Sequence, residues 1–231
     1  SPMCTGCYWS FKVKDWSKVD YIEVWSEPFP SIEEKNIRAF KLWTDLLNRG
    51  YRLTAVSGRD WHGGDCGKDP VAVTYLEIEK ETEDMEKAVK EAIARGRASV
   101  TMGPLLLIQA VTENGSPVLT SGDVAYVGSS EENVKITVKI DYFTRKDKYV
   151  LDEKDMRVTL ESSKGRLEEI PVSCERDEVS VTLSSKDVKW LRAELYGKMC
   201  GKNTLIAFTN PIYFCERPQE GSNGCFKTHI Y

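Results

Sequence analysis

Two side chains that can ligate a metal ion stand one residue apart in the first third of the sequence. Asp60 and His62 follow a short apolar run at residues 53–57 and a glycine, Gly58. A carboxylate oxygen and an imidazole nitrogen are both good ligands for a divalent metal. In parallel α/β folds, such ligands lie in loops at the carboxyl ends of buried strands. The pattern therefore predicts a metal-binding loop after this strand, with Asp60 and His62 as ligands.

Two ligands are too few for a catalytic metal site, which needs about three protein ligands and an open position. Glu23, Asp65 and Asp69 are further acidic candidates in the same part of the chain. Glu23 lies in a predicted strand whose apolar neighbours should face the other side. It would therefore point into the interior of a barrel, or else lie at the surface or be buried in an ion pair. His229 is interpreted as a solvated residue near the C-terminus.

Three residues are candidates for substrate binding. Arg59 places a cation beside the two ligands, where it would either repel a metal ion or hold a substrate anion. Trp61 stands between the ligands and would form a pocket wall. Glu23 is the third candidate.

The chain has seven cysteines. An odd number cannot form a closed disulfide framework, and reduced thiols of a cytosolic protein are the expected state. Cys4 and Cys7 form a C-x-x-C motif, but the chain has no second one to complete a zinc ribbon. A thiol-dependent site formed by Cys4, Cys7 and Cys66 remains a third, weaker hypothesis for function.

The elements that would position the metal-binding loop alternate between strands and helices. Apolar and β-branched runs predict strands at 19–25, 53–57, 71–78 and 98–102. A capping box that starts at Ser31 opens a first amphipathic helix, which Gly50 ends. A second helix is predicted at 82–95, where Gly96 stops it. This alternation is typical of the α/β class.

Beyond residue 103 the helical periodicity stops and short β-rich runs lie between turn signals. These runs are 105–111, 124–127, 134–143, 156–160, 179–183, 190–196, 204–208 and 212–215. Their number and spacing predict an antiparallel β-sandwich. We therefore expect two domains, an α/β unit at 1–103 and a β-sandwich accessory domain at 104–231.

Composition excludes several classes of partner. The net charge is -4 and the pI is near 5.5, so the chain lacks the basic footprint expected for nucleic acid or an anionic membrane. No apolar run approaches the ~20 residues that span a bilayer, and no signal peptide is visible. The expectation is a soluble chain, with the cytoplasm as the favoured location.

Several stretches, taken in order, resemble the PHP (polymerase and histidinol phosphatase) metal-dependent hydrolases, in their CehA/McbA-like branch. The matching stretches are 20–25 (DYIEVW), 41–50 (KLWTDLLNRG), 57–62 (SGRDWH), 70–75 (PVAVTY) and 94–104 (ARGRASVTMGP). Later stretches at 190–197 (WLRAELYG) and 207–213 (AFTNPIY) resemble the C-terminal β module of that branch. Together they cover most of the chain.

The resemblance implies a distorted β/α barrel in which Asp60 and His62 ligate one of several catalytic metals, and hydrolysis of phosphate or related esters. The family's opening His-x-His motif and its middle ligands are absent from this sequence, and Ser1 stands where relatives carry a histidine before proline. Arg59 also replaces a residue that is usually small. The resemblance therefore implies the C-terminal part of the barrel followed by the β module.

Two functions follow as expectations. The first is the C-terminal portion of a PHP-type hydrolase that binds zinc, manganese or iron incompletely and is inactive alone. Its open strand edges would then be covered by self-association into a homo-oligomer or by an upstream barrel segment. The second is a non-catalytic binding module that works through the β-sandwich.

Overall fold

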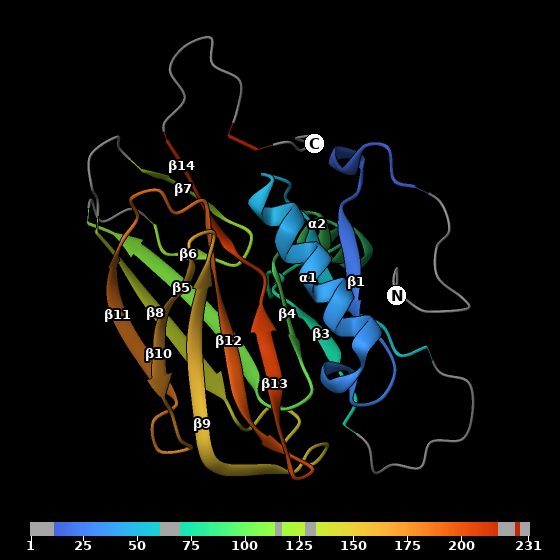
Figure 1. The fold of residues 1–231 in the computed structure, drawn as a ribbon. Helices are drawn as coiled ribbons and strands as arrows, with labels where there is room; N and C mark the ends of the chain where they lie inside the picture. Colours follow the sequence, from blue (N-terminus) through green and yellow to red (C-terminus); the bar gives the residue numbers. More distant parts are fainter. Residues whose placement is uncertain (1–11, 61–69, 114–116, 128–132, 217–224, 227–231) are drawn as a thin grey trace.

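The computed structural model describes residues 12–60, 70–113, 117–127, 133–216 and 225–226 (Figure 1). Within these residues the chain forms two α-helices, two short 3-10 helices and fourteen strands. No described helix has the length and apolar character needed to cross a membrane. The chain is therefore mostly β, with the helices confined to its first hundred residues.

The first unit is a strand, a helix and a second strand. Strand β1 (Tyr21–Trp25) and strand β2 (Thr54–Ser57) pair in parallel, and helix α1 (Glu34–Asn48) connects them. The apolar face of α1 buries Trp43, Leu46 and Leu47, as its helical spacing predicts. Gly50 has a φ of 86°, which confirms its predicted left-handed role after the helix.

The predicted cap of α1 is wrong. Ser31 lies in a 3-10 turn, η2 (Pro30–Ile32), and the helix starts only at Glu34, after Glu33 as N-cap. The hydroxyl of Ser31 lies 2.6 Å from the hydroxyl oxygen of Thr204 on a distant strand. This tertiary hydrogen bond replaces the local capping bond.

A second helix separates two strands that pair in the opposite sense. Strand β3 (Val73–Leu76) is antiparallel to strand β4 (Ala98–Thr101), and helix α2 (Met85–Arg95) lies between them in the sequence. Asp84 caps α2 by accepting a hydrogen bond from the amide of Lys87. Gly96 ends it with a φ of 80°, as predicted.

The remaining strands, with a short η1 (Trp16–Lys18) before β1, complete the fold. They are β5 (Leu105–Thr112), β6 (Leu119–Thr120), β7 (Val124–Val127), β8 (Asn133–Asp141), β9 (Leu151–Ser162), β10 (Gly165–Pro171), β11 (Glu178–Ser184), β12 (Trp190–Met199), β13 (Lys202–Thr209) and β14 (Ile212–Glu216). One sheet has the order β10-β9-β12-β13-β4-β3; in addition, β14 pairs with β12, and β7 pairs with β14. The other has the order β11-β8-β5-β6.

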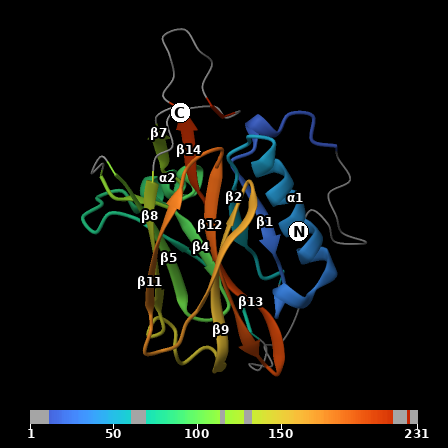
Figure 2. The ribbon, with the colours of Figure 1, turned by 60° about the vertical axis from the view of Figure 1, so that its left-hand side comes forward.

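The two larger sheets face each other, and the β1–α1–β2 unit lies against one side of them (Figures 1 and 2). Alternating buried residues of β5 and β8, among them Leu106, Ile108 and Ile136, form the inner face of the smaller sheet. One continuous apolar core includes residues of both sheets and of α1.

An aromatic cluster joins α1 to the large sheet. The ring of Phe208 on β13 contacts Trp25 of β1 and both Phe40 and Trp43 of α1, with ring centroids 4.9 to 5.6 Å apart. Such edge-on contacts stabilise beyond the area that they bury. The helix therefore packs on a strand that comes some 160 residues later in the chain.

The predicted partial β/α barrel is wrong. Only one parallel pair, β1–β2, resembles a barrel segment, and the two described helices are too few to surround a barrel. In the large sheet, β4 is antiparallel both to β3 on one side and to β13 on the other. The later parallel pair, β7–β14, has no described helix between its strands. Antiparallel strands can be joined by short loops. The parallel strands of a β/α barrel each need a crossover helix instead.

The predicted boundary at 103/104 stays a prediction. Strands from both sides of it share the large sheet, since β3 and β4 precede the boundary and β13 follows it. The 1–103 and 104–231 parts therefore share main-chain hydrogen bonds as well as a core.

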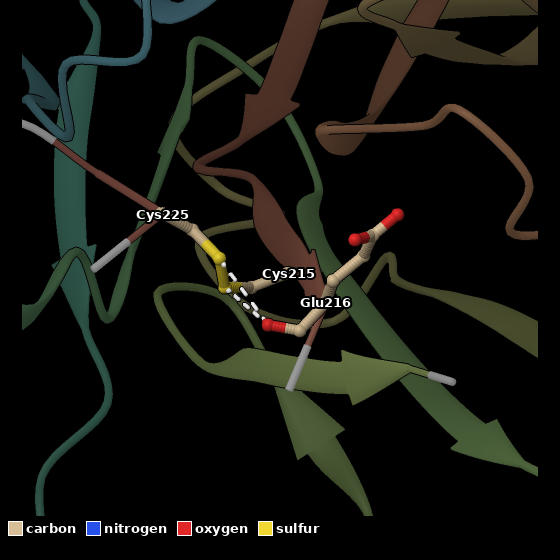
Figure 3. The surroundings of a disulfide bond; sticks show 3 residues. All are labelled: Cys215, Glu216 and Cys225. Atoms are coloured by element: carbon tan, nitrogen blue, oxygen red, sulfur yellow. Dashed lines mark hydrogen bonds between the residues drawn. A yellow bond between two sulfur atoms is a disulfide. The ribbon is translucent and has the colours of Figure 1, made fainter. Parts of the chain in front are cut away.

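A disulfide fastens part of the C-terminal tail. Cys215 on β14 is bonded to Cys225, and their Cα atoms lie 5.8 Å apart (Figure 3). Next to it, the ring of Phe226 meets that of Tyr213 edge-on at 5.3 Å. The prediction that all thiols are reduced is therefore wrong for this pair, because the tail returns to β14, a tertiary contact that spacing alone does not reveal.

Candidate functional site

The predicted loop leaves the sheet where the carboxyl ends of two parallel strands meet. The amide of Gly58 donates a hydrogen bond to the carbonyl of Trp25 at 2.8 Å, which continues the β1–β2 pairing to the start of the loop. The amide of Ser57 donates to the hydroxyl of Thr74 on β3 at 2.9 Å, and the two hydroxyl oxygens lie 3.1 Å apart. The start of the loop is thus held from both sides.

The carboxylate of Glu23 lies over the backbone of Gly58. Glu23 pairs with Val56 in the β1–β2 register, and a Cβ added at Gly58 would overlap the Glu23 carboxylate. Glycine is therefore the residue that leaves room for this side chain. The structure brings one of the three predicted substrate-binding candidates to the beginning of the predicted metal-binding loop.

Asp60 follows two residues later, in a left-handed conformation. Its φ is 44°, and both Arg59 and Asp60 are exposed. Aspartate adopts this conformation more readily than most residues do. Arg59 and Asp60 are thus accessible, as a site for a metal or an anion requires.

The other predicted site residues lie outside the described residues. These are Trp61, His62, Asp65, Cys66 and Asp69, together with Cys4, Cys7 and His229. Among the residues that the structure does describe, no three histidine, cysteine, aspartate or glutamate side chains lie close enough to hold a metal ion. The described part of the site therefore supplies two carboxylates, Glu23 and Asp60.

Backbone strain marks the end of β1. Glu27 and Phe29 both have left-handed φ values, 69° and 47°, although neither is glycine. Asn36 fixes this turn, since its side chain accepts from the amide of Ser26 and donates to the carbonyls of Ser26 and Pro30. Strained turns concentrate at functional sites. This one adjoins the carboxyl ends of β1 and β2.

A separate polar hollow of about 710 Å³ lies beside α2. Its charged lining residues are Glu77, Glu79, Asp84 and Glu91 on the acidic side and Lys80, Lys87, Arg95 and Arg97 on the basic side. The two signs balance, and Arg97 already pairs with Glu77 and Asp123. Such a lining favours neither an anionic nor a cationic ligand.

A buried ion pair is the main polar feature that sequence reasoning missed. Arg192 and Glu194 on β12 are each 3 % exposed, and the guanidinium of Arg192 donates to the Glu194 carboxylate at 2.7 and 2.8 Å. The hydroxyl of Tyr196 donates to the same carboxylate at 2.7 Å. The signal in the sequence was the alternation of these three polar residues along a strand.

The aromatic rings of α1 enclose the cationic end of this group. The guanidinium of Arg192 lies 4.6 Å from the ring centroids of Phe40 and Trp43 and 5.0 Å from that of Trp190. It also donates to the hydroxyl of Thr44 at 3.1 Å. Burial, and then the neighbouring Glu194 carboxylate, raise the pKa of Tyr196 well above its ordinary value. The group is closed to solvent, so its role is to join α1 to β12.

The described thiols offer no reactive cluster. Cys174 and Cys200 are exposed, in separate loops, and Cys215 is bonded to Cys225. The hypothesis of a site at Cys4, Cys7 and Cys66 concerns residues outside the described ones and stays a prediction.

Comparisons with family models, curated proteins and solved structures found no match for this chain. The relationship to PHP hydrolases therefore rests on the sequence motifs alone.

Proposed function

We propose that the loop after β2 contributes ligands to a divalent-metal centre of a PHP-type, phosphoesterase-like hydrolase. This chain would supply the C-terminal portion of that enzyme. The observation that supports the proposal is the Glu23 carboxylate over Gly58, at the joined carboxyl ends of two parallel strands and two residues before Asp60. The proposal concerns this loop and does not require a barrel.

The donor set fits part of a metal site. Glu23 and Asp60 supply carboxylate oxygens, and His62 would supply an imidazole nitrogen, a mixture that suits zinc, manganese or iron. A divalent metal there would activate water for attack on an ester. Arg59 would hold the anionic part of the substrate beside it. Each of these roles belongs to a residue at or near one strand end.

The chain alone should not turn over substrate. A catalytic centre with two or three metals needs more ligands than Glu23, Asp60 and His62 provide. The remaining ligands would come from a separate segment or a partner chain. We therefore expect metal binding without phosphatase activity from the isolated chain.

Metal content tests the proposal directly. The purified chain is loaded with zinc or manganese, dialysed and measured by elemental analysis, and affinity is measured by titration calorimetry. We expect Asp60→Asn and His62→Ala to lose binding, while Asp45→Asn on the exposed face of α1 keeps it. No binding by the parent chain, or binding that both loop variants retain, would overturn the proposal.

Gly58→Ala separates the position of Glu23 from its charge. The new methyl group would overlap the carboxylate, which lies at the far end of a flexible side chain and can move aside. We therefore expect folding stability to change by less than about 1 kcal/mol, whereas metal affinity falls as it does in Glu23→Gln. Unchanged affinity in both variants would remove Glu23 from the ligand set.

A second candidate function is a non-catalytic interaction module formed by the β-rich part. The β8–β9 loop carries Phe143 and Val150, which are 80 % and 84 % exposed. Two apolar side chains so exposed on one loop favour contact with a partner. A parent chain without metal affinity would leave this candidate as the better one.

A further inference from the structure

The outer edge of the smaller sheet is formed by β11, a seven-residue strand (Figures 1 and 2). It pairs with β8 along its whole length, from Glu178 opposite Lys139 to Ser184 opposite Asn133, without a bulge. Its other side faces away from the sheet. A regular strand with one open side is a template for pairing with another strand.

One hydrogen bond shows which backbone groups of β11 point away from β8. The amide of Ile140 donates to the carbonyl of Asp177 at 2.7 Å, so residue 177 belongs to a hydrogen-bonded pair with β8. In an antiparallel ladder such pairs alternate. The N–H and C=O groups of Glu178, Ser180, Thr182 and Ser184 therefore point away from β8. Among the described residues, no backbone hydrogen bond outside the ladders uses them.

The corresponding edge of the large sheet is protected. Strand β10 ends in Pro171, and its register shifts between Arg166 and Glu168. Arg166 also pairs with Glu161 and Glu169. Proline, bulges and charges are the usual means of blocking edge pairing. β11 contains none of them between residues 179 and 184, since that part reads Val-Ser-Val-Thr-Leu-Ser.

We propose that two copies of this chain pair through β11, antiparallel and with the two-fold axis at Thr182. In this register Thr182 faces its own copy, and Ser180 faces Ser184. Val181 faces Leu183. Glu178 at the start of one strand comes level with Lys186, which lies in the turn just after β11 of the other copy. The residues with outward-pointing backbone groups, Thr182, Ser180 and Ser184, would then form the hydrogen-bonded pairs, as the ladder requires.

The side chains match on both faces. Val181 and Leu183 are only partly buried at the end of the core, and pairing would cover them with each other. The hydroxyl-bearing residues lie together on the outer face. Glu178 and Lys186 are exposed and form no ion pair among the residues that the structure describes, and the two-fold axis brings two Glu–Lys pairs within reach of each other. Shifting the axis to Val181 would instead bring Lys186 level with Arg176, in the turns that flank β11, so charge favours the Thr182 register.

This inference is independent of the metal site. The metal-binding loop follows the β1–β2 pair, whereas β11 belongs to the four-stranded sheet. The first test is molar mass by light scattering and sedimentation over a range of concentrations. We expect a reversible monomer–dimer equilibrium for the parent chain. A monomer at every concentration would overturn the proposal.

Thr182→Pro tests whether the open edge of β11 forms the contact between the two copies. Proline removes an outward N–H that no bond within the chain uses, so the fold should survive, as circular dichroism would show. We expect this variant to be monomeric, whereas Thr182→Val, which keeps the N–H, should still dimerise. A folded Thr182→Pro variant that dimerises like the parent would mean that another surface forms the dimer.

Charge exchange tests the register and does not depend on the proline variant. Glu178→Lys or Lys186→Glu alone turns two attractions into two repulsions, so the dissociation constant should rise about tenfold. The double exchange Glu178→Lys with Lys186→Glu should restore it. Dimerisation that is insensitive to both single changes would exclude the Thr182-centred register.

Discussion

The side-chain amide of Asn210 binds the backbone of Ala55 as a neighbouring strand would. Its Oδ1 accepts from the Ala55 amide at 2.7 Å, and its Nδ2 donates to the Ala55 carbonyl at 3.0 Å. The same Nδ2 lies 3.1 Å from the carbonyl of Ala98. One buried side chain thus links β2 to the beginning of β4.

Asn210→Ala should destabilise the chain by about 2 to 4 kcal/mol. The change leaves the N–H and C=O of Ala55 buried without these partners, and each such group costs about 1 to 3 kcal/mol. Urea unfolding would measure the loss, with the exposed Asn203→Ala on β13 as the control. Equal stability of the two variants would show that water replaces the amide.

Glu194→Ala should lower the free energy of unfolding by about 3 to 5 kcal/mol, because the guanidinium of Arg192 would stay buried without its counter-charge. Replacing both residues, as in Arg192→Met with Glu194→Leu, should cost less than Glu194→Ala alone. The exposed pair of Glu86 and Lys90 provides the control, and Glu86→Ala should cost less than about 0.5 kcal/mol. If the double variant is the least stable, the ion pair itself stabilises the fold.

Alkaline pH should weaken the fold through Tyr149. Burial raises the pKa of Tyr149 to about 12, and its hydroxyl donates to the carbonyl of Tyr142 at 2.8 Å. Since the pKa of Tyr149 in the folded chain exceeds its ordinary value of 10.0, this contribution to stability is complete below pH ~10 and is lost as the pH rises to ~12. We expect Tyr149→Phe to flatten the pH dependence of unfolding in this window. An unchanged slope would contradict the assignment.

Reduction should loosen the C-terminal tail. The disulfide closes a loop with a sequence separation of 10, which corresponds to about 3 kcal/mol in the chain-entropy account. Thermal unfolding with and without dithiothreitol measures this. The double variant Cys215→Ser with Cys225→Ser should have the lower melting temperature and no response to dithiothreitol. Serine at the exposed Cys174 and Cys200, which lie outside this disulfide, should leave the response intact.

Local patterns predicted most elements correctly. The helix at 82–95 and the strand at 98–102 lie within a few residues of α2 and β4, because their apolar periodicity agrees with their burial. Strand β10 was missed, since the sequence from Arg166 to Ile170 lacks strict alternation and the bulge there shifts the register. An edge strand with little burial gives a weak pattern.

The barrel prediction failed for a different reason. A strand–helix–strand pattern fits β1–α1–β2 equally well as part of a barrel or as an isolated unit. The sequence did not reveal that β4 would pair with β13, because no local pattern specifies a partner about 110 residues away. In the same way, the loop position of Asp60 was predictable, whereas the approach of Glu23 to Gly58 depends on the β1–β2 register.

The pairing of β4 with β13 also constrains synthesis in the cell. Ser99 faces Thr209 across this pair, so this part of the large sheet cannot form until the ribosome has made residue 209. At typical elongation rates of about 5 to 20 residues per second, β3 and β4 wait on the order of 5 to 20 seconds for their partner. During this interval a nascent chain exposes the edge of β4. That edge is open to pairing with other strands until β13 has been made.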